Sequence, residues 1–233
     1  MGKSTSLLLV GFLTGILAAT VGFSLLLKYK PKSTQGDGAL VLKLGHSLPT
    51  KHPVHRGIER MKGRLEELSG GTITIDIYPG SVLGSEVECI EQLQNGSLAM
   101  TKTSAAALEG FVPEMAVFGF PYLFRDEAHC WSVLDGAVGK RLLEKGSSRY
   151  LRGLCYYDAG SRNFYTKDRP IEKPEDLANM KIRVMKSATA MNMVEAFGAS
   201  PTPIAWGELY SALAQGTVDG ADCLLYTSDA ADE

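Results

Sequence analysis

Residues 40–78 read LVLKLGHSLPTKHPVHRGIERMKGRLEELSGGTITIDIY, and this stretch decides the fold class. Residues 40–47 show alternating apolar positions, which is typical of a half-buried strand. In residues 54–68 apolar side chains recur at steps of three or four, the spacing of an amphipathic helix, with Pro53 near its start and two glycines after its end. Residues 72–78 are rich in β-branched side chains and predict a second strand. This order of strand, helix and strand indicates an α/β sheet fold.

The same alternation continues along the rest of the chain. Ser85 and Glu88 have the spacing of a capping box, which predicts a helix that begins there, and Asp126 marks the polar start of another helix. Further strands are expected at residues 98–103, 149–157, 161–166, 181–184 and 200–204. Further helices are expected at residues 188–197 and 206–215, and a helical turn within the loop at 170–179. The whole pattern predicts an α/β protein.

The composition disfavours several classes of function. The 233 residues carry a formal net charge of −2, so nucleic-acid binding has no electrostatic support. The four cysteines form no CxxC pair, and we find no GxSxG, HExxH, P-loop or GxGxxG motif. His46, His52 and His55 come nearest to a metal cluster, and we interpret them as a solvated surface at a helix start. We therefore expect no enzyme activity, no cofactor or metal and no nucleic-acid partner.

The N-terminus carries a long apolar run. Residues 6–27 contain no charged side chain, and a run of this length can span a bilayer as a helix. We interpret residues 1–27 as a signal peptide or N-terminal membrane anchor, and favour an anchor that is uncleaved or inefficiently cleaved, because no clear cleavage site is present. Residues 28–39 are polar and contain glycine, as a linker does. This segment predicts export to the periplasm.

The C-terminal residues 223–233 read CLLYTSDAADE. A permitted back-translation of their first six residues, TGTCTCTTATACACATCT, resembles the end of a transposon-based sequencing adapter. We therefore expect residues 223–233 to be a non-native tail and the chain to be truncated at its C-terminus.

Two arginines stand out as candidate binding residues. Arg183 lies inside the short strand KIRV, where its neighbours Ile182 and Val184 would face one side of the sheet and Arg183 the other. A guanidinium in this position suits a bidentate contact with a carboxylate. Arg162 lies in GSRNFY, just after an apparent turn between strands. From the pattern alone, a surface arginine paired with a nearby acid is an equally good interpretation of Arg183.

Five motifs give the chain a family resemblance. They are LKLGHSLPTKHPVHRGIERM, YPGSVLGSEVECIEQLQNGSLAM, VFGFPYLFRDEAHCWSVLDG, GSRNFYTKDRPI and MKIRVMKSATAMNMVEAFGASPTPIAWGELYSALAQGTVDGAD. In this order, over residues 40–222, they resemble the DctP-type substrate-binding subunit of TRAP transporters. The resemblance implies a two-lobed periplasmic-binding-protein-like fold with the ligand in a cleft between the lobes. We expect lobe I at residues 40–159 and a partial lobe II at residues 160–222, the second lobe being incomplete.

The resemblance also implies roles for individual residues. Arg183 matches the arginine that forms the principal salt bridge to the ligand carboxylate, and Arg162 matches a second ligand-binding arginine. The resemblance also matches positions that line the cleft to His46, Glu86, Ser104 and Trp206. Trp206 would stack on the ligand or close the cleft, with core packing as the plainer alternative. Glu86 would meet ligand hydroxyls, unless it is a capping or surface acid.

The function implied is that of an extracytoplasmic solute receptor. It would bind a small organic acid, either a sugar acid or a C4-dicarboxylate, and deliver it to the membrane permease subunits of a TRAP transporter. The long apolar N-terminus also suggests an alternative, a membrane-tethered ligand-sensing module of a signalling protein. The Cys223 position departs from the family, which usually places an asparagine there that faces the ligand.

Overall fold

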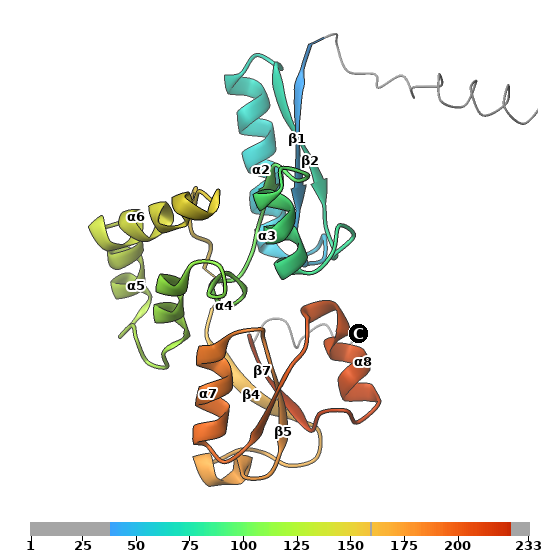
Figure 1. Ribbon diagram of the computed structural model, residues 1–233, viewed down its shortest axis with the longest axis vertical. Helices are drawn as coiled ribbons and strands as arrows, with labels where there is room; N and C mark the ends of the chain where they lie inside the picture. The colour runs from blue at the N-terminus through green and yellow to red at the C-terminus, as the bar shows by residue number, and fades with distance from the viewer. Residues whose placement is uncertain (1–37, 159, 225–233) are drawn as a thin grey trace, which may run out of the picture. The chain divides into compact units, whose positions relative to one another are not determined.

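The computed structural model describes residues 38–158 and 160–224 (Figure 1). The chain divides into two compact units, residues 1–39 and residues 40–233. The predicted signal peptide or anchor at residues 1–27 and nearly all of the linker lie outside the described residues, and so does the tail from residue 225 onward. Across the described ranges, no helix is long and apolar enough to cross a membrane.

The first sheet has three parallel strands in the order β2-β1-β3. These strands are β1 (Leu40–Gly45), β2 (Ile73–Tyr78) and β3 (Met100–Thr101). The helix α2 (Pro53–Leu68) joins β1 to β2, and α3 (Glu86–Gln94) joins β2 to β3. The apolar stripe of α2 contributes Ile58 to a core shared with Leu44 of β1 and Ile75 of β2, as amphipathic spacing requires.

The predicted helix starts are confirmed by their hydrogen bonds. Ser85 Oγ accepts from Glu88 N at 3.4 Å, and Ser85 N donates to Glu88 Oε2 at 2.7 Å, so the capping box of α3 is formed. Asp126 Oδ1 accepts from His129 N at 2.7 Å and caps α5 (Glu127–Leu134). Short polar side chains at these positions satisfy amide groups that would otherwise lack a partner.

The described regular elements between the two sheets are all helices. They are α4 (Ala105–Leu108), η1 (Pro113–Gly119), α5, α6 (Ala137–Glu144) and η2 (Lys145–Arg149). The strand predicted at residues 149–157 is wrong, because η2 ends at Arg149 and residues 150–158 contain no strand. Leu151 packs into a helical core cluster instead, and Gly153 N donates to Leu143 O at 2.9 Å. Leu151 therefore packs against helices and not against a sheet, and Leu154 of the same segment is 65% exposed.

The second sheet is mixed, in the order β4-β7-β5-β6. Its strands are β4 (Arg162–Thr166), β5 (Lys181–Val184), β6 (Ser200–Pro203) and β7 (Gly220–Leu224). The strands β5, β6 and β7 are parallel, and β4 is antiparallel to β7. The helix α7 (Ala188–Ala196) joins β5 to β6, while η4 (Trp206–Glu208) and α8 (Leu209–Ala214) precede β7. In Figure 1, α7 and α8 lie on either side of this sheet.

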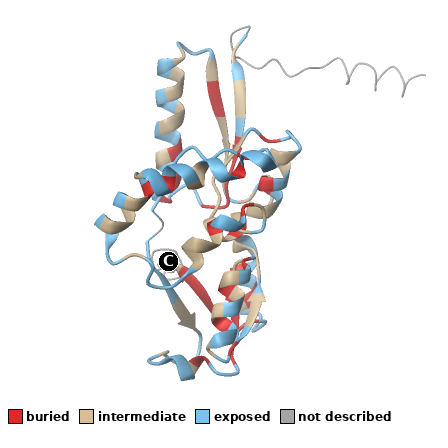
Figure 2. Ribbon diagram, turned by 60° about the vertical axis from the view of Figure 1, so that its left-hand side comes forward, coloured by how far each residue is buried: buried red, intermediate tan, exposed pale blue. Residues whose placement is uncertain are grey.

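The central strand β7 was not predicted from the sequence. Its first four residues are buried (Figure 2), and the strand includes Cys223 and Leu224, the first residues of the predicted tail. Two sheets with helices between their strands confirm the α/β class.

One carboxylate links the helical segment to the second sheet. Glu109, directly after α4, accepts from Ser187 Oγ at 2.5 Å, from Thr189 N at 3.1 Å and from Thr189 Oγ1 at 3.0 Å. Ser187 is the N-cap of α7, so Glu109 lies at the positive end of that helix. The N-cap of α7, four residues beyond Arg183, is thereby linked to the end of α4.

Candidate functional site

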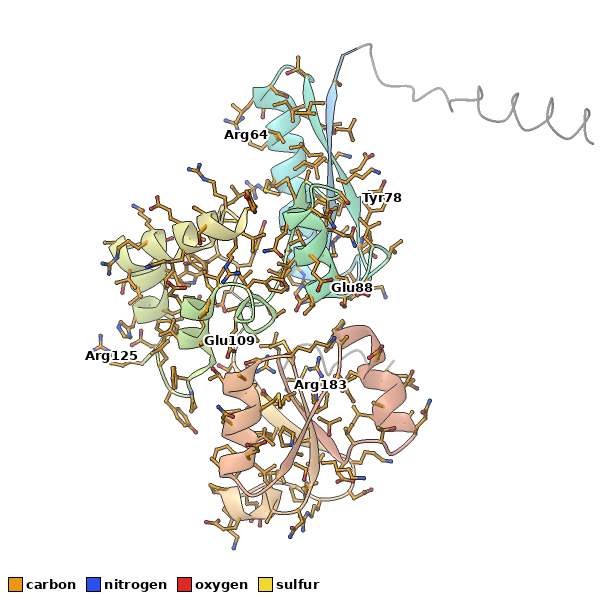
Figure 3. The ribbon with its side chains drawn as sticks, viewed as in Figure 1. Arg64, Tyr78, Glu88, Glu109, Arg125 and Arg183 are labelled. Carbon is orange, nitrogen blue, oxygen red and sulfur yellow. The ribbon has the colours of Figure 1, made fainter. Side chains whose placement is uncertain are left out.

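Arg183 is the third residue of the strand β5 (Figure 3). Its exposed fraction is 2%. Its neighbours Ile182 and Val184 belong to the core cluster on the α7 side, so the predicted alternation is confirmed. Arg183 Nε donates to Ile204 O at 2.9 Å. The interpretation of Arg183 as a surface arginine is wrong, because the side chain is buried.

The terminal nitrogens of Arg183 are the chemically notable feature. Within residues 38–158 and 160–224 they have no hydrogen-bond partner, and no acid forms a salt bridge with them. Burial lowers the pKa of Arg183, and the positive charge of Arg162 lowers it further, while Cys223, Asp222 and Glu86 act in the opposite direction. A guanidinium nevertheless stays protonated in proteins. A buried cation with two unused nitrogens is therefore available to an anion.

Arg162 is held by a carboxylate of the neighbouring strand. Its Nε lies 2.9 Å from Asp222 Oδ1, and its Nη2 donates to Asp222 Oδ2 and to Asp222 O, both at 2.8 Å. The Asp222 side chain is 4% exposed and that of Arg162 is 33% exposed. Only Nη1 of Arg162 points elsewhere, 3.9 Å from Met185 Sδ. Arg162 thus has a carboxylate partner within the chain, which Arg183 lacks among the described residues.

Glu86, Ser104 and Lys102 form a cluster beside the first sheet. Glu86 Oε2 accepts from Ser104 Oγ at 2.6 Å, and Glu86 Oε1 accepts from Ser104 N at 3.1 Å. Lys102 Nζ lies 3.6 Å from Glu86 Oε1, with side-chain exposures of 17% for Lys102 and 15% for Glu86. Glu86 is therefore not a surface acid. It occupies the first turn of α3, where a negative charge is favourable, and Ser104 caps α4.

His46 follows the end of β1 and is 2% exposed. Its Nδ1 accepts from Leu48 N at 3.2 Å, so its Nε2 carries the proton and donates to His55 Nδ1 at 2.9 Å. His55 Nε2 in turn lies 3.5 Å from Glu59 Oε1. Burial, followed by the nearby His55 and Lys102, lowers the pKa of His46 to about 4, so this imidazole is neutral near pH 7.

The three histidines do not form the solvated surface that the sequence predicted. His46, His52 and His55 are only 2%, 8% and 6% exposed. The first turn of α2 packs over the end of β1, which brings residues nine positions apart into contact. Among the described residues, no group of three or more His, Cys, Asp or Glu side chains could hold a metal ion.

Trp206 packs in the cluster on the other side of the second sheet. It is partly buried against Leu209, Ala221 and Cys223. Ala221 is the register partner of Arg183 in the parallel pair, so Trp206 and Arg183 belong to the same face of the sheet. These contacts agree with core packing, the plainer alternative to a role of Trp206 at the ligand or in closing the cleft.

The predicted site residues fall into two groups. Arg183, Arg162 and Trp206 belong to the second sheet, whereas His46, Glu86 and Ser104 lie beside the first. The two groups influence each other, because the charge of Glu86 acts on the pKa of Arg183. Several of these residues lie at or beyond the carboxyl ends of parallel strands, which is where open α/β sheets bind ligands.

Sequence reasoning missed the partners of these residues. Neither Lys102 nor Asp222 was among the candidate site residues. The two amino acids are common surface types, and no spacing connects Lys102 with Glu86 or Asp222 with Arg162. Only the order of the strands brings each pair together.

Comparison with known proteins gives a consistent family assignment. Residues 44–226 match the sequence profile of DctP, described as bacterial extracellular solute-binding protein, family 7. A TRAP periplasmic solute-binding protein of Xanthobacter autotrophicus, crystallised with β-D-galacturonate, is 37% identical, with a TM-score of 0.76 over 78% of this chain and 61% of that one. The corresponding protein of Sulfurospirillum deleyianum, with succinate, is 34% identical, with a TM-score of 0.77 over 81% of this chain and 61% of that one.

A curated relative has similar coverage. The uncharacterized protein YiiZ of Salmonella typhimurium is 36% identical over 186 residues, which are 79% of this chain and 57% of the relative. The chain therefore spans about 60% of the length of the proteins it matches. These matches cover both described sheets, and the family is one of binding proteins, not of enzymes. The chain belongs to the DctP family of bacterial extracellular solute-binding proteins, those of TRAP transporters.

Proposed function

We propose that this protein is the extracytoplasmic receptor of a TRAP-type transporter and that it binds a small organic acid through a salt bridge to Arg183. The observation that carries the proposal is the buried guanidinium with two terminal nitrogens that lack partners within the described residues. A carboxylate would supply two parallel charge-assisted hydrogen bonds to these nitrogens. The two crystallised relatives were solved with β-D-galacturonate and with succinate, and both ligands carry carboxylates.

The other predicted residues have secondary roles in this proposal. Arg162 is engaged by Asp222, so it offers at most its Nη1 to the ligand. Ser104 and Glu86 supply hydrogen-bonding groups from the side of the first sheet, whereas both ring nitrogens of His46 are already hydrogen-bonded to Leu48 and His55. The ligand would lie between the two lobes, residues 40–159 and 160–222, and their closure around it would be a hinge motion.

Location and partner follow from the family. The crystallised relatives are periplasmic proteins, so we propose that this protein also acts in the periplasm and transfers its ligand to TRAP permease subunits. The alternative of a membrane-tethered sensor rests on residues 6–27, which lie outside the described residues.

The test compares acids with their neutral analogues. The protein, expressed from its complete reading frame, is titrated by calorimetry with sugar acids and C4-dicarboxylates and with the matching amides. We expect acids to bind and amides to lose most of the affinity, because a neutral ligand leaves the buried Arg183 unpaired. Equal binding of an acid and its amide would contradict the proposed salt bridge.

A further inference from the structure

The charged side chains of the candidate site leave one cation unbalanced. Of the side chains other than the Cys223 thiol that act on Arg183, Arg162 and Asp222 form an ion pair at 2.8 Å, and Glu86 is paired with Lys102 at 3.6 Å. Both pairs are close to neutral as units. Arg183 is then the remaining positive charge in this set.

Glu86 has an acceptor position left after its contacts within the chain. It receives hydrogen bonds from Ser104 N and Ser104 Oγ, and Lys102 lies beside Oε1. An ionised carboxylate has about four acceptor sites, so a hydroxyl donor can still be accommodated. A second carboxylate on the ligand would meet the negative charge of Glu86 instead, and the cation nearest to it, Lys102, is already paired.

We infer that the Glu86–Lys102 pair determines which ligand charge the site accepts. The pair selects hydroxylated monocarboxylates, such as aldonates or uronates, over dicarboxylates. This inference rests on the proposed function, because it assumes that Arg183 holds one carboxylate. Glu86 accepts from a ligand hydroxyl and repels a second carboxylate, while Lys102 lies 3.6 Å from Glu86 Oε1 and partly balances its negative charge. Lys102 is thus a specificity-determining residue that acts through Glu86.

The inference predicts opposite effects for the two members of the pair. Glu86→Gln removes the repulsion and leaves Lys102 as a second cation, so affinity for a dicarboxylate should rise at least about tenfold relative to a monocarboxylate. Lys102→Gln leaves Glu86 unbalanced, so a dicarboxylate should lose more affinity than a monocarboxylate. The matched control is Glu91→Gln, an exposed acid on the same helix α3, which should change neither affinity.

The probes are D-galactonate and galactarate, which share the same open carbon chain and differ at one end, where galactarate has a second carboxylate in place of a hydroxymethyl group. Calorimetry on the protein from its complete reading frame should show tighter binding of galactonate, a reduced or inverted preference in Glu86→Gln, and an enlarged preference in Lys102→Gln. A wild-type preference for galactarate, or equal changes for both acids in both variants, would overturn the inference while leaving the acid receptor intact. If neither these acids nor any other carboxylate binds, the proposed function fails, and the inference fails with it.

Discussion

The polar residues beside the first sheet are hydrogen-bonded to one another, whereas the second sheet carries a guanidinium with a single hydrogen bond. Beside β1 and β3, His46 pairs with His55, and Glu86 pairs with Ser104 and Lys102. On β5, Arg183 makes one hydrogen bond to the described part of the chain, from Nε to Ile204 O. This difference distinguishes the side chains that are paired within the chain from the guanidinium that we propose binds the ligand, because a buried charge is costly until it is paired.

The second sheet itself carries one arginine with a carboxylate partner and one without such a partner among the described residues. Arg162 and Arg183 act on each other electrostatically, yet Arg162 has a buried carboxylate partner and Arg183 has none among the described residues. The strand β7 supplies that partner through Asp222, while its neighbouring residue Ala221, in register with Arg183, supplies only a methyl group. One strand therefore neutralises one arginine and leaves the other.

The largest expected effect is the loss of the unpaired guanidinium. Arg183→Ala should weaken binding of the cognate acid by about 2–5 kcal/mol, because it removes a desolvated charge pair. Arg183→Lys should also weaken binding, since an ammonium cannot form the parallel pair of hydrogen bonds. Calorimetry of both variants measures the change in affinity, and Arg64→Ala, which alters an exposed arginine, is the control. Near-wild-type affinity in Arg183→Ala would show that the carboxylate binds elsewhere.

The second prediction concerns the pH dependence of the free energy of unfolding that the buried His46, beside the first sheet, should cause. The pKa of His46 is lowered to about 4, chiefly by burial, so the folded protein resists protonation of this side chain. As the pH falls from about 6.5 toward about 4, the unfolded chain takes up a proton that the folded state does not. The free energy of unfolding should therefore be full above about pH 6.5 and fall through this window, by up to about 3 kcal/mol for this one residue.

Urea unfolding at a series of pH values measures this slope. His46→Gln should flatten it, while His129→Gln, which changes a histidine of α5 that is not fully buried, should leave it as it is. Because burial also lowers the pKa of His52, some slope should remain in His46→Gln. Identical slopes in wild type and His46→Gln would mean that His46 is protonated as readily in the folded protein as in the unfolded chain.

Local patterns predicted much of the fold. The strand at residues 181–184 and the caps at Ser85 and Asp126 are where the sequence places them, because each depends on neighbouring residues only. The strand β7 was missed because its residues, GADCL, contain a glycine and an acid that look exposed. Asp222 can be buried there only because Arg162, sixty positions earlier in the chain, neutralises it.

The candidate site, like the fold, could be predicted from the sequence only where it depends on neighbouring residues. Arg183 could be singled out from its position in a short apolar strand, and its family match added a role that remains a prediction. The burial of His46 and the Glu86–Lys102 pair could not be predicted, because both depend on which strand ends meet at the edge of the first sheet. Pairing between residues that are distant in the sequence thus decides which charged side chains stay unpaired. This pairing cannot be predicted from a single sequence.

The smallest of the three effects should come from the paired arginine. Asp222→Asn preserves the shape of the side chain but removes the charge that holds Arg162 Nε and Nη2. Breaking a fully buried pair costs about 3–5 kcal/mol, but the Arg162 side chain is 33% exposed and water can solvate it, so we expect a loss of about 2 kcal/mol in the free energy of unfolding. The control is Glu67→Gln in the exposed pair with Arg64, for which the loss should stay below about 1 kcal/mol. If the two substitutions cost the same, the Arg162–Asp222 pair does not stabilise the second sheet. If Asp222→Asn instead tightens acid binding, Arg162 is a ligand-binding arginine that Asp222 restrains, and the contrast between a paired and an unpaired arginine would reflect only the state without ligand.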